Sequence, residues 1–308
     1  MVTTKRVESL SSAGHRLGQI IGDWWEIQVI YPLLEQVASE LGLFLDNRIV
    51  QRKCRSEKIQ WADAEGNLVD YDYVLELDGS LSKKGIPVAF LESFWRRGAR
   101  HSKDKARDDT NKLLPMRDTY PTARFLAIAA CGEFTEPAKD YVRSRNVELF
   151  FISKEKIVES FQTIDIEIDY PDSLSEKMKA DLVSKMESKF SLENKMIAAE
   201  NLKNIAGKSS FASFKQRIIG SLTATPQKIS ICSLARSSPM VFDSIEDAER
   251  FLNAEKPRFP NRSEIAHYEY QASFSDGSDF ARELHSLDDV RNVNNQLMSL
   301  VNHFSNRY

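Results

Sequence analysis

Apolar residues in the first part of the chain recur first at helical spacing and then at strand spacing. The helical spacing covers residues 17–42 and predicts an amphipathic helix that ends at Gly42, with Pro32 as a candidate kink. Turn residues then separate four segments with strand character, at about 48–54, 58–63, 68–77 and 85–95. This part of the chain therefore predicts one long helix followed by strands joined in hairpins.

Helices and strands alternate in the segment that follows. A helix is predicted over 101–116, ending near Pro115, and after it come a strand at 124–130, a helix at 136–144, a strand at 147–152 and a helix at 153–161. Such alternation is typical of an α/β protein with a mixed central sheet and helices on both faces. We therefore expect a first domain over residues 1–165.

The last part of the chain has a different pattern. Residues 166–222 are polar and helical, with too few apolar residues for a core of their own, and predict a helical connector. Residues 223–308 contain a weak repeat of two strand-strand-helix units, whose helices open at Ser244 and Ser286 with an acidic residue three positions later. Because one such unit cannot bury its own face, the two are expected to pair into a small α+β domain.

Composition narrows the class of protein. With 42% hydrophobic and 28% charged residues among 308, the chain is expected to be globular. There is no run of eighteen apolar residues and no secretory signal at the start, which predicts a cytoplasmic protein with no membrane partner. The net charge of −3 excludes a uniformly basic surface, so any nucleic-acid contact must be local. The chain has no CxxC zinc motif, no GxxxxGK[ST] loop, no GxSxG elbow and no HExxH helix.

Two separated acidic positions indicate the chemistry. Hydrolysis of a phosphodiester requires a divalent cation at the phosphate, and clustered carboxylates suit Mg²⁺ because this ion prefers oxygen ligands. The two-residue period of a strand places Asp70, Asp72 and Glu76 on one face of 68–77. Glu92 lies within the apolar run 85–95, where a buried carboxylate is costly unless a cation or a donor compensates it.

A hairpin would bring Asp72 and Glu92 to neighbouring strands and create a shared metal site. Asp70 is an alternative ligand, and Mn²⁺ is an alternative to Mg²⁺. The structural alternative is that the acids form buried ion pairs with arginines of the basic segment that follows.

This arrangement resembles the PD-(D/E)xK, or restriction-endonuclease-like, nuclease superfamily. An acid on one strand is followed about twenty residues later by an acid in an apolar strand (PVAFLES) and then by a helix, and the order of elements over 17–152 is similar to the superfamily core. The resemblance implies that Asp72 takes the place of the motif's aspartate and Glu92 that of its second acid. It also implies an assisting role for Glu26, where many members carry a further glutamate on the preceding helix.

The chain departs from this motif at the lysine, which is replaced by Phe94. Phenylalanine can neither orient water nor stabilise negative charge, but members of the superfamily recruit this cation from elsewhere. Here Lys105, Lys103 or Arg97 could reach back to the acids. The stretch ESFWRRGARHSKDKARDD also resembles an ES-x-WRR…HS-x-x-KA signature of restriction-like proteins, which favours Lys105 together with His101 and Ser102.

The segment after Glu92 is strongly basic. Residues 96–107 contain six Lys or Arg against one acid, and a basic cluster beside a carboxylate pair suits contacts with DNA phosphates. The predicted nucleic-acid-binding residues are Arg96, Arg97, Arg100, His101, Ser102, Lys103 and Arg107. The alternative is that they form a solvated helix face.

Together these features predict a Mg²⁺-dependent DNA endonuclease of a restriction or phage-defence system. We expect a homodimer, because cutting both strands of a duplex usually requires two active sites, and the C-terminal domain could supply dimer contacts or target recognition. The alternative is a catalytically inactive protein of the nuclease fold that binds DNA or acts as a scaffold for a partner subunit in a defence complex. Phe94 in place of the motif lysine is its main support.

Overall fold

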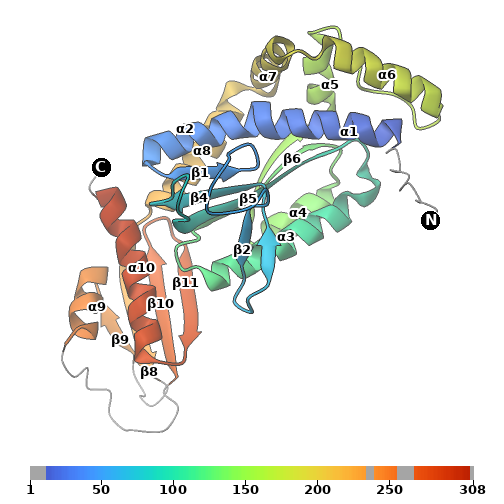
Figure 1. Ribbon diagram of the computed structural model, residues 1–308. Helices are drawn as coiled ribbons and strands as arrows, with labels where there is room; N and C mark the ends of the chain where they lie inside the picture. Colours follow the sequence, from blue (N-terminus) through green and yellow to red (C-terminus); the bar gives the residue numbers. More distant parts are fainter. Residues whose placement is uncertain (1–11, 234–238, 255–266, 306–308) are drawn as a thin grey trace, which may run out of the picture.

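The computed structural model describes residues 12–233, 239–254 and 267–305. Figure 1 shows a larger unit built around a five-stranded sheet and a smaller C-terminal unit built around a four-stranded sheet. The predicted α/β class, with a mixed sheet flanked by helices and a small C-terminal sheet, is confirmed. No helix among the described residues combines the length and apolar character needed to cross a membrane.

The predicted long helix is present, but it is not regular. Helix α1 (Ala13–Trp24) continues through a π-helical turn (Trp25–Ile30) into α2 (Tyr31–Leu41). Pro32 is the second residue of α2 and has no N–H to donate, so it cannot form the regular hydrogen bond to the carbonyl of Gln28 in this turn. The helix ends as predicted at Gly42, whose φ of 64° and ψ of 37° are left-handed values that glycine adopts at low cost.

The central sheet has the order β1-β4-β5-β6-β7. Its strands are β1 (Phe44–Asn47), β4 (Tyr73–Leu77), β5 (Ile86–Arg96), β6 (Phe125–Gly132) and β7 (Glu148–Ser153). The β1–β4 and β4–β5 pairs are antiparallel, whereas β5, β6 and β7 run parallel through crossovers that contain α3 (Ser102–Thr119) and α4 (Glu136–Ser144). A separate hairpin, β2 (Gln60–Ala62) and β3 (Leu68–Asp70), projects beside the sheet in Figure 1.

Three predicted elements differ from those observed. The strand expected at 48–54 is wrong: β1 ends at Asn47, and the chain then turns so that the buried Arg52 guanidinium donates to Asp46 and Glu76. The run at 68–77 is divided between β3 and β4. Helix α3 does not stop near Pro115 but continues to Thr119. Pro115 has no N–H to donate to the carbonyl of Asn111, and because Asn111 is exposed to solvent, this missing hydrogen bond does not end the helix.

Helices cover both faces of the sheet. One face packs against α3 and α4 in a core that includes Phe90, Leu113 and Val142. The other face packs against the long N-terminal helix, α5 (Lys154–Gln162) and α8 (Lys208–Thr223), and α6 (Glu176–Lys189) and α7 (Leu192–Ala206) pack against these helices. The apolar residues of α6, α7 and α8 belong to the same core as those of the sheet, so residues predicted as a connector form part of the larger unit.

The smaller unit contains two successive strand-strand-helix units. Its elements are β8 (Pro226–Ser233), β9 (Met240–Phe242), α9 (Ile245–Leu252), β10 (Tyr268–Phe274), β11 (Asp279–Leu284) and α10 (Leu287–Ser305). The strands pair antiparallel in the order β11-β10-β8-β9 and share one apolar core with α9 and α10. Ser244 and Ser286 cap the two helices, each accepting a hydrogen bond from the N–H of the acidic residue three positions later.

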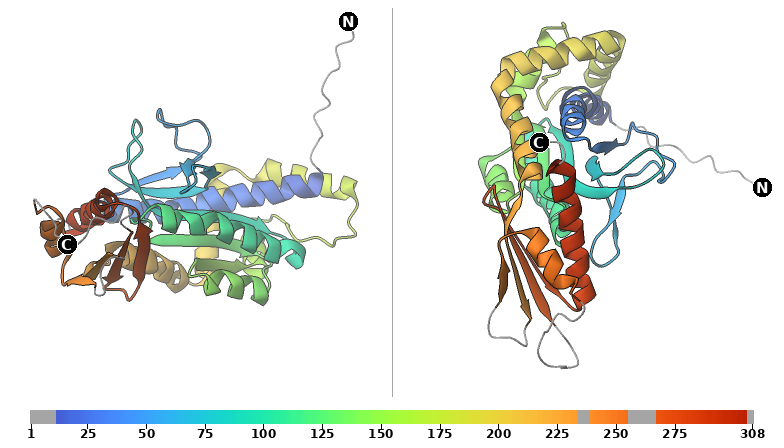
Figure 2. Two further views of the ribbon diagram at one scale, coloured as in Figure 1. Left: turned by 90° about the horizontal axis from the view of Figure 1, so that it is seen from below. Right: turned by 90° about the vertical axis from the view of Figure 1, so that its left-hand side faces the viewer.

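Contacts between the two units include the end of α10 and the start of β6. The end of α10 inserts Leu300 and Phe304 into the core of the larger unit, and His303 Nε2 lies 2.8 Å from the carbonyl oxygen of Leu41. At the start of β6, Arg124 meets the turn between β10 and β11. Figure 2 shows that α6 and α7 lie at the end of the molecule far from the C-terminal unit.

Candidate active site

Asp72 and Glu92 lie side by side on the central sheet. Asp72 directly precedes β4 and Glu92 lies within β5. The antiparallel register pairs Tyr73 with Leu91, which are the chain neighbours of Asp72 and Glu92. Oδ2 of Asp72 accepts a 2.7 Å hydrogen bond from the main-chain N–H of Ser93. The structure therefore brings together the two acids that the sequence analysis paired.

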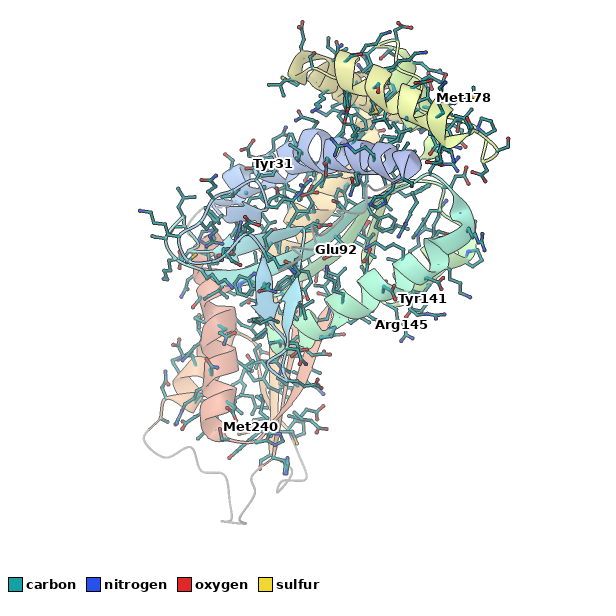
Figure 3. The ribbon with its side chains drawn as sticks, turned by 45° about the vertical axis from the view of Figure 1, so that its right-hand side comes forward. Tyr31, Glu92, Tyr141, Arg145, Met178 and Met240 are labelled. Carbon is teal, nitrogen blue, oxygen red and sulfur yellow. The ribbon has the colours of Figure 1, made fainter. Side chains whose placement is uncertain are left out.

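Glu92 lies in the interior of the larger unit, between the long N-terminal helix and α3 (Figure 3), and its residue surface is only 3% exposed. Lys112 Nζ lies 2.7 Å from Glu92 Oε1, an ion pair that lacks the alignment of a hydrogen bond. Burial, and then the charge of Asp72, hold the pKa of Glu92 well above its usual value despite the opposing effect of Lys112. The charge of Glu92 is therefore only partly balanced by Lys112, and no arginine among the described residues forms an ion pair with Glu92.

Helix α3 presents three charged residues to these acids. Lys105, Asp109 and Lys112 are spaced four and three residues apart, so they share one helix face. Lys105 Nζ donates a 2.6 Å hydrogen bond to Asp109 Oδ1, while the buried Asp109 Oδ2 has no hydrogen-bond partner within the described ranges. Burial raises the pKa of Asp109 and of Asp72, and Lys112 and Lys105 only partly offset the rise at Asp72. The site thus contains more buried negative charge than its lysines balance.

Glu26 approaches Asp72 from the π-helical turn of the N-terminal helix. Its Oε1 accepts hydrogen bonds from Arg48 Nε at 2.8 Å and from Asn47 Nδ2 at 2.9 Å, and Asn47 Nδ2 also donates to the main-chain oxygen of Asp72. Burial, and to a smaller extent the charge of Asp72, raise the pKa of Glu26. Turns of π-helix are frequent at functional sites, and this one directs an acid towards the sheet.

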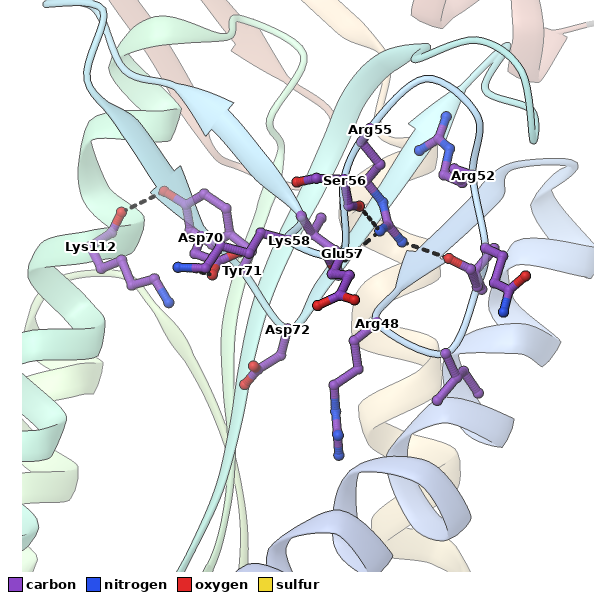
Figure 4. Close-up of a pocket in the computed structure, with 14 residues that line it drawn as sticks. Arg48, Arg52, Arg55, Ser56, Glu57, Lys58, Asp70, Tyr71, Asp72 and Lys112 are labelled. Carbon is purple, nitrogen blue, oxygen red and sulfur yellow. Dashed lines mark hydrogen bonds and ion pairs between the residues drawn. The ribbon is translucent and has the colours of Figure 1, made fainter. Parts of the chain in front are cut away.

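Asp72 borders a pocket of about 800 Å³, whereas Glu92 and Glu26 are not among the residues that line it. Five Lys or Arg and three acids line it, and Figure 4 shows Asp72 between Lys112 on one side and Arg48 on the other. Arg52 and Arg55 are almost fully buried and paired with Asp46, whereas the side chains of Arg48 and Lys58 are 44% and 66% exposed. A ligand that enters this pocket would meet Arg48, Lys58 and Lys112 on its way to Asp72.

Asp70, the predicted alternative ligand, has a different environment. Its carboxylate is 42% exposed and lies 3.6 Å from Lys58 Nζ at the pocket. The ion-pair partner of Asp70, Lys58, therefore belongs to the loop that follows β1, whereas the partner of Glu92, Lys112, belongs to helix α3.

Asp72 and Glu92 are the candidate metal ligands of this site. Within residues 12–233, 239–254 and 267–305, no three His, Cys, Asp or Glu side chains converge into a metal-binding group. Mg²⁺ is, however, commonly held by one or two carboxylates and keeps several of its waters. Asp72 and Glu92 supply two such ligands, and the raised pKa values of these acids indicate uncompensated negative charge that a cation would balance. The donor set thus fits a partly hydrated divalent ion.

Several residues of the predicted DNA-binding segment are engaged elsewhere. The Arg97 guanidinium donates to the carbonyl of Tyr170 and to Asp172, and it lies 4.4 Å from the centre of the Tyr170 ring. Ser102 is fully buried, and its Oγ lies 3.3 Å from Thr135 Oγ1. Arg96 is partly buried, and the side chain of His101 is outside the described part of the structure. Exposed side chains of this segment include Arg100, Lys103 and Arg107.

The sequence analysis missed three residues of this site, namely Lys112, Asp109 and Arg48. A signal for the first two was present, because they follow Lys105 at helical spacing on the face of α3 that also contains the apolar Leu113 and Met116. Arg48 had no comparable signal, since its contact with Glu26 joins residues 22 positions apart through a loop.

Comparisons of this chain with models of known protein families, with curated proteins and with solved structures give no match.

Proposed function

We propose that the protein is a metal-dependent DNA endonuclease of the PD-(D/E)xK type, with Mg²⁺ or Mn²⁺ as its cofactor. The observation that supports this most directly is the position of Asp72 beside Glu92, with Lys112 of α3 in an ion pair with Glu92 and a pocket with five Lys or Arg in front of Asp72. The order of the long helix, the antiparallel β1, β4 and β5, α3 and the parallel β6 agrees with the core that the resemblance implies.

In this proposal Asp72 and Glu92 hold the ion, and Glu26 assists from the π-helical turn. The bound ion would act as a Lewis acid on the scissile phosphate. Lys112 supplies the positive charge that the motif lysine provides in the superfamily, since Phe94 cannot, and Lys105 is the second candidate for this role. Lys112 is preferred because it contacts Glu92 directly, whereas Lys105 is bonded to Asp109.

DNA would approach through the pocket in front of Asp72. Arg48 and Lys58 are the exposed cations there, and Lys112 is 28% exposed. Because each phosphate contact releases counterions, binding by this surface should weaken steeply as salt increases. The exposed Arg100, Lys103 and Arg107 at the start of α3 could extend the same contact.

Cleavage of supercoiled plasmid by the full chain in Mg²⁺ or Mn²⁺ tests the proposal. The variants are Asp72→Asn and Glu92→Gln, with Asp181→Asn on the exposed face of α6 as a matched control. We expect each site variant to reduce the cleavage rate by a factor of about 100 or more while DNA binding persists, and the control to retain wild-type cleavage. Cleavage that survives both site substitutions would contradict the assignment.

A second candidate is a catalytically inactive protein of the same fold that binds DNA or serves as a scaffold in a defence complex. Phe94 at the lysine position, and the lack of a three-residue metal group within the residues described, favour it. DNA binding without cleavage in either metal ion would support this candidate. A homodimer is part of the endonuclease proposal, and light scattering of the full chain at several concentrations tests it.

A further inference from the structure

A second pocket, of about 890 Å³, lies between the two units of the molecule. The starts of β6 and β7, the ends of α3 and α4, and the turn between β10 and β11 contribute to its lining, and its residues are different from those around Asp72. Four arginines line it, Arg117, Arg124, Arg143 and Arg217, against three acids, Glu148, Asp276 and Asp279. This lining is unusual because two of the arginines are largely buried.

Arg124 is the central residue of this pocket, and its side chain is 6% exposed. Its guanidinium lies over the ring of Phe274, and its Nη2 donates to Ser278 Oγ at 2.6 Å and reaches Asp276 Oδ1 only at 3.4 Å. The buried Nε has no hydrogen-bond partner among the residues that the structure describes. Burial, with a smaller contribution from the charge of Arg117, lowers the pKa of Arg124 to about 10 even though Asp276 and Asp279 oppose the shift. The nearby acids Asp276 and Asp279 therefore compensate this cation only in part.

The other arginines leave additional positive charge facing the pocket. Arg117 donates to the carbonyl of Asn146 at 2.7 Å, and burial lowers its pKa as well. Arg143 reaches Asp140 only at 3.8 Å, and Arg217 Nε is paired with Glu148 at 2.8 Å. Glu148 is therefore already neutralised by Arg217, so less acid remains to balance Arg117 and Arg124.

We propose that this pocket binds a small phosphorylated ligand of about nucleotide size. Arginine forks match phosphate oxygens, and several converging arginines favour an anion with more than one charge. The pocket is far larger than inorganic phosphate and lies within the range of small-molecule sites. Because Arg124 comes from β6 and Ser278 from the β10–β11 turn, a bound ligand would connect the two units. This proposal does not depend on the nuclease proposal.

Calorimetric titration of the full chain with ATP, AMP, pyrophosphate and inorganic phosphate, without divalent cations, tests the proposal. A short DNA duplex is included because its backbone carries the same chemical group. We expect ATP or pyrophosphate to bind with a dissociation constant below about 1 mM, and Arg117→Gln to weaken that binding by roughly tenfold or more. Arg124→Gln should weaken the binding of the anion further. If the Arg124 variant does not fold, Arg117→Gln still tests the proposal, because Arg117 is less buried than Arg124.

Two controls separate this site from the others. The double variant Asp72→Asn/Glu92→Gln should bind the anion like wild type, and so should Arg250→Gln, whose side chain is 79% exposed on α9. The proposal is overturned if no anion binds in the millimolar range, if both pocket variants bind as wild type does, or if the double variant abolishes binding. Binding of the duplex alone, weakened by Arg117→Gln, would also overturn it and would assign the pocket to the DNA backbone.

Discussion

The environment of Glu92 disfavours its ionised carboxylate, which is the form that would bind a metal ion in the proposed function. Its carboxylate is buried, faces Asp72 and has Lys112 as its ion-pair partner. Placing like charges close together in a site of low polarity costs free energy of folding, and binding of a divalent cation would recover it. Functional sites commonly contain such strain, because the groups are arranged for a ligand and not for stability of the free protein.

We predict that Glu92→Gln stabilises the metal-free protein. Because the folded-state pKa of Glu92 is raised, the folded chain binds more protons than the unfolded chain between the ordinary pKa, about 4.3, and the raised value. Stability should therefore fall as pH rises through this interval in wild type, and the variant removes that fall. Lys112, which is 28% exposed, can be solvated when its partner becomes neutral.

Urea unfolding at several pH values measures this effect. The free energy of unfolding of the variant should exceed that of wild type by roughly 1 kcal/mol at about pH 8, and the difference should vanish towards about pH 4. Addition of Mg²⁺ should stabilise wild type and not the variant. A variant less stable than wild type at the higher pH would show that the ion pair with Lys112 outweighs the cost of burial.

The two lysines of α3 can be ranked by substitution. Lys112→Met should reduce plasmid cleavage by a factor of about 100 to 1000, because it removes the cation that contacts Glu92. Lys105→Met should have a smaller effect, since Lys105 is bonded to Asp109 and influences the pKa of Asp72 less than Lys112 does. DNA binding measured in parallel separates catalysis from affinity. A larger loss of cleavage in Lys105→Met than in Lys112→Met would indicate that Lys105 takes the place of the motif lysine.

Among the secondary structures, the N-terminal helix controls where Glu26 lies. Its π-helical turn is anchored from the sheet, because the Tyr73 hydroxyl donates a 2.7 Å hydrogen bond to the carbonyl of Glu26 and Trp25 Nε1 donates to the carbonyl of Ala129 at 2.9 Å. Both contacts are buried and join the helix to different strands. They fix the rotation of the helix, and with it the direction in which the Glu26 side chain points.

Substitution Tyr73→Phe tests this anchor. It removes one buried hydroxyl, and the carbonyl of Glu26 keeps the N–H of Tyr31 as a partner, so the free energy of unfolding should fall by only about 1 kcal/mol. Tyr141→Phe is the matched control, because the Tyr141 hydroxyl forms a solvent-exposed contact with Asn111 and its removal should change stability little. Equal effects of the two substitutions in urea unfolding would argue against a specific anchor.

At the scale of the whole molecule, the end of α10 joins the smaller unit to the larger one. The C-terminal sheet has its own apolar core, and Leu300 and Phe304 of α10 extend from it into the core of the larger unit. The four tryptophans lie in the larger unit, at Trp24, Trp25, Trp61 and Trp95. Tryptophan fluorescence therefore reports on one unit and far-UV circular dichroism on both.

We predict that Phe304→Ala uncouples the two units. Truncation of this buried side chain should destabilise the docking of α10 by about 3 kcal/mol, so the circular-dichroism transition in urea should begin before the fluorescence transition. Ser299→Ala on the exposed face of the same helix is the control and should leave both curves unchanged. Coincident transitions in Phe304→Ala would show that the other contacts suffice for coupling.

Local pattern in the sequence determined most elements of the fold. The helical period ending at Gly42, the apolar run around Glu92 and the alternation of strands and helices from 124 to 161 each reflect constraints that act over a few residues. The same local reasoning identified Asp72 and Glu92, because a hairpin fixes which residues of two successive strands become neighbours.

Only the tertiary structure decided which cations contact Glu92 and Glu26. Lys112 reaches Glu92 through the rotation of α3 on the sheet, and Arg48 reaches Glu26 because the loop after β1 folds inward around the buried Arg52. It also decided that α6, α7 and α8 complete the core of the larger unit and that the arginine pocket forms between the two units. These features depend on packing between segments far apart in the chain, which no local periodicity encodes.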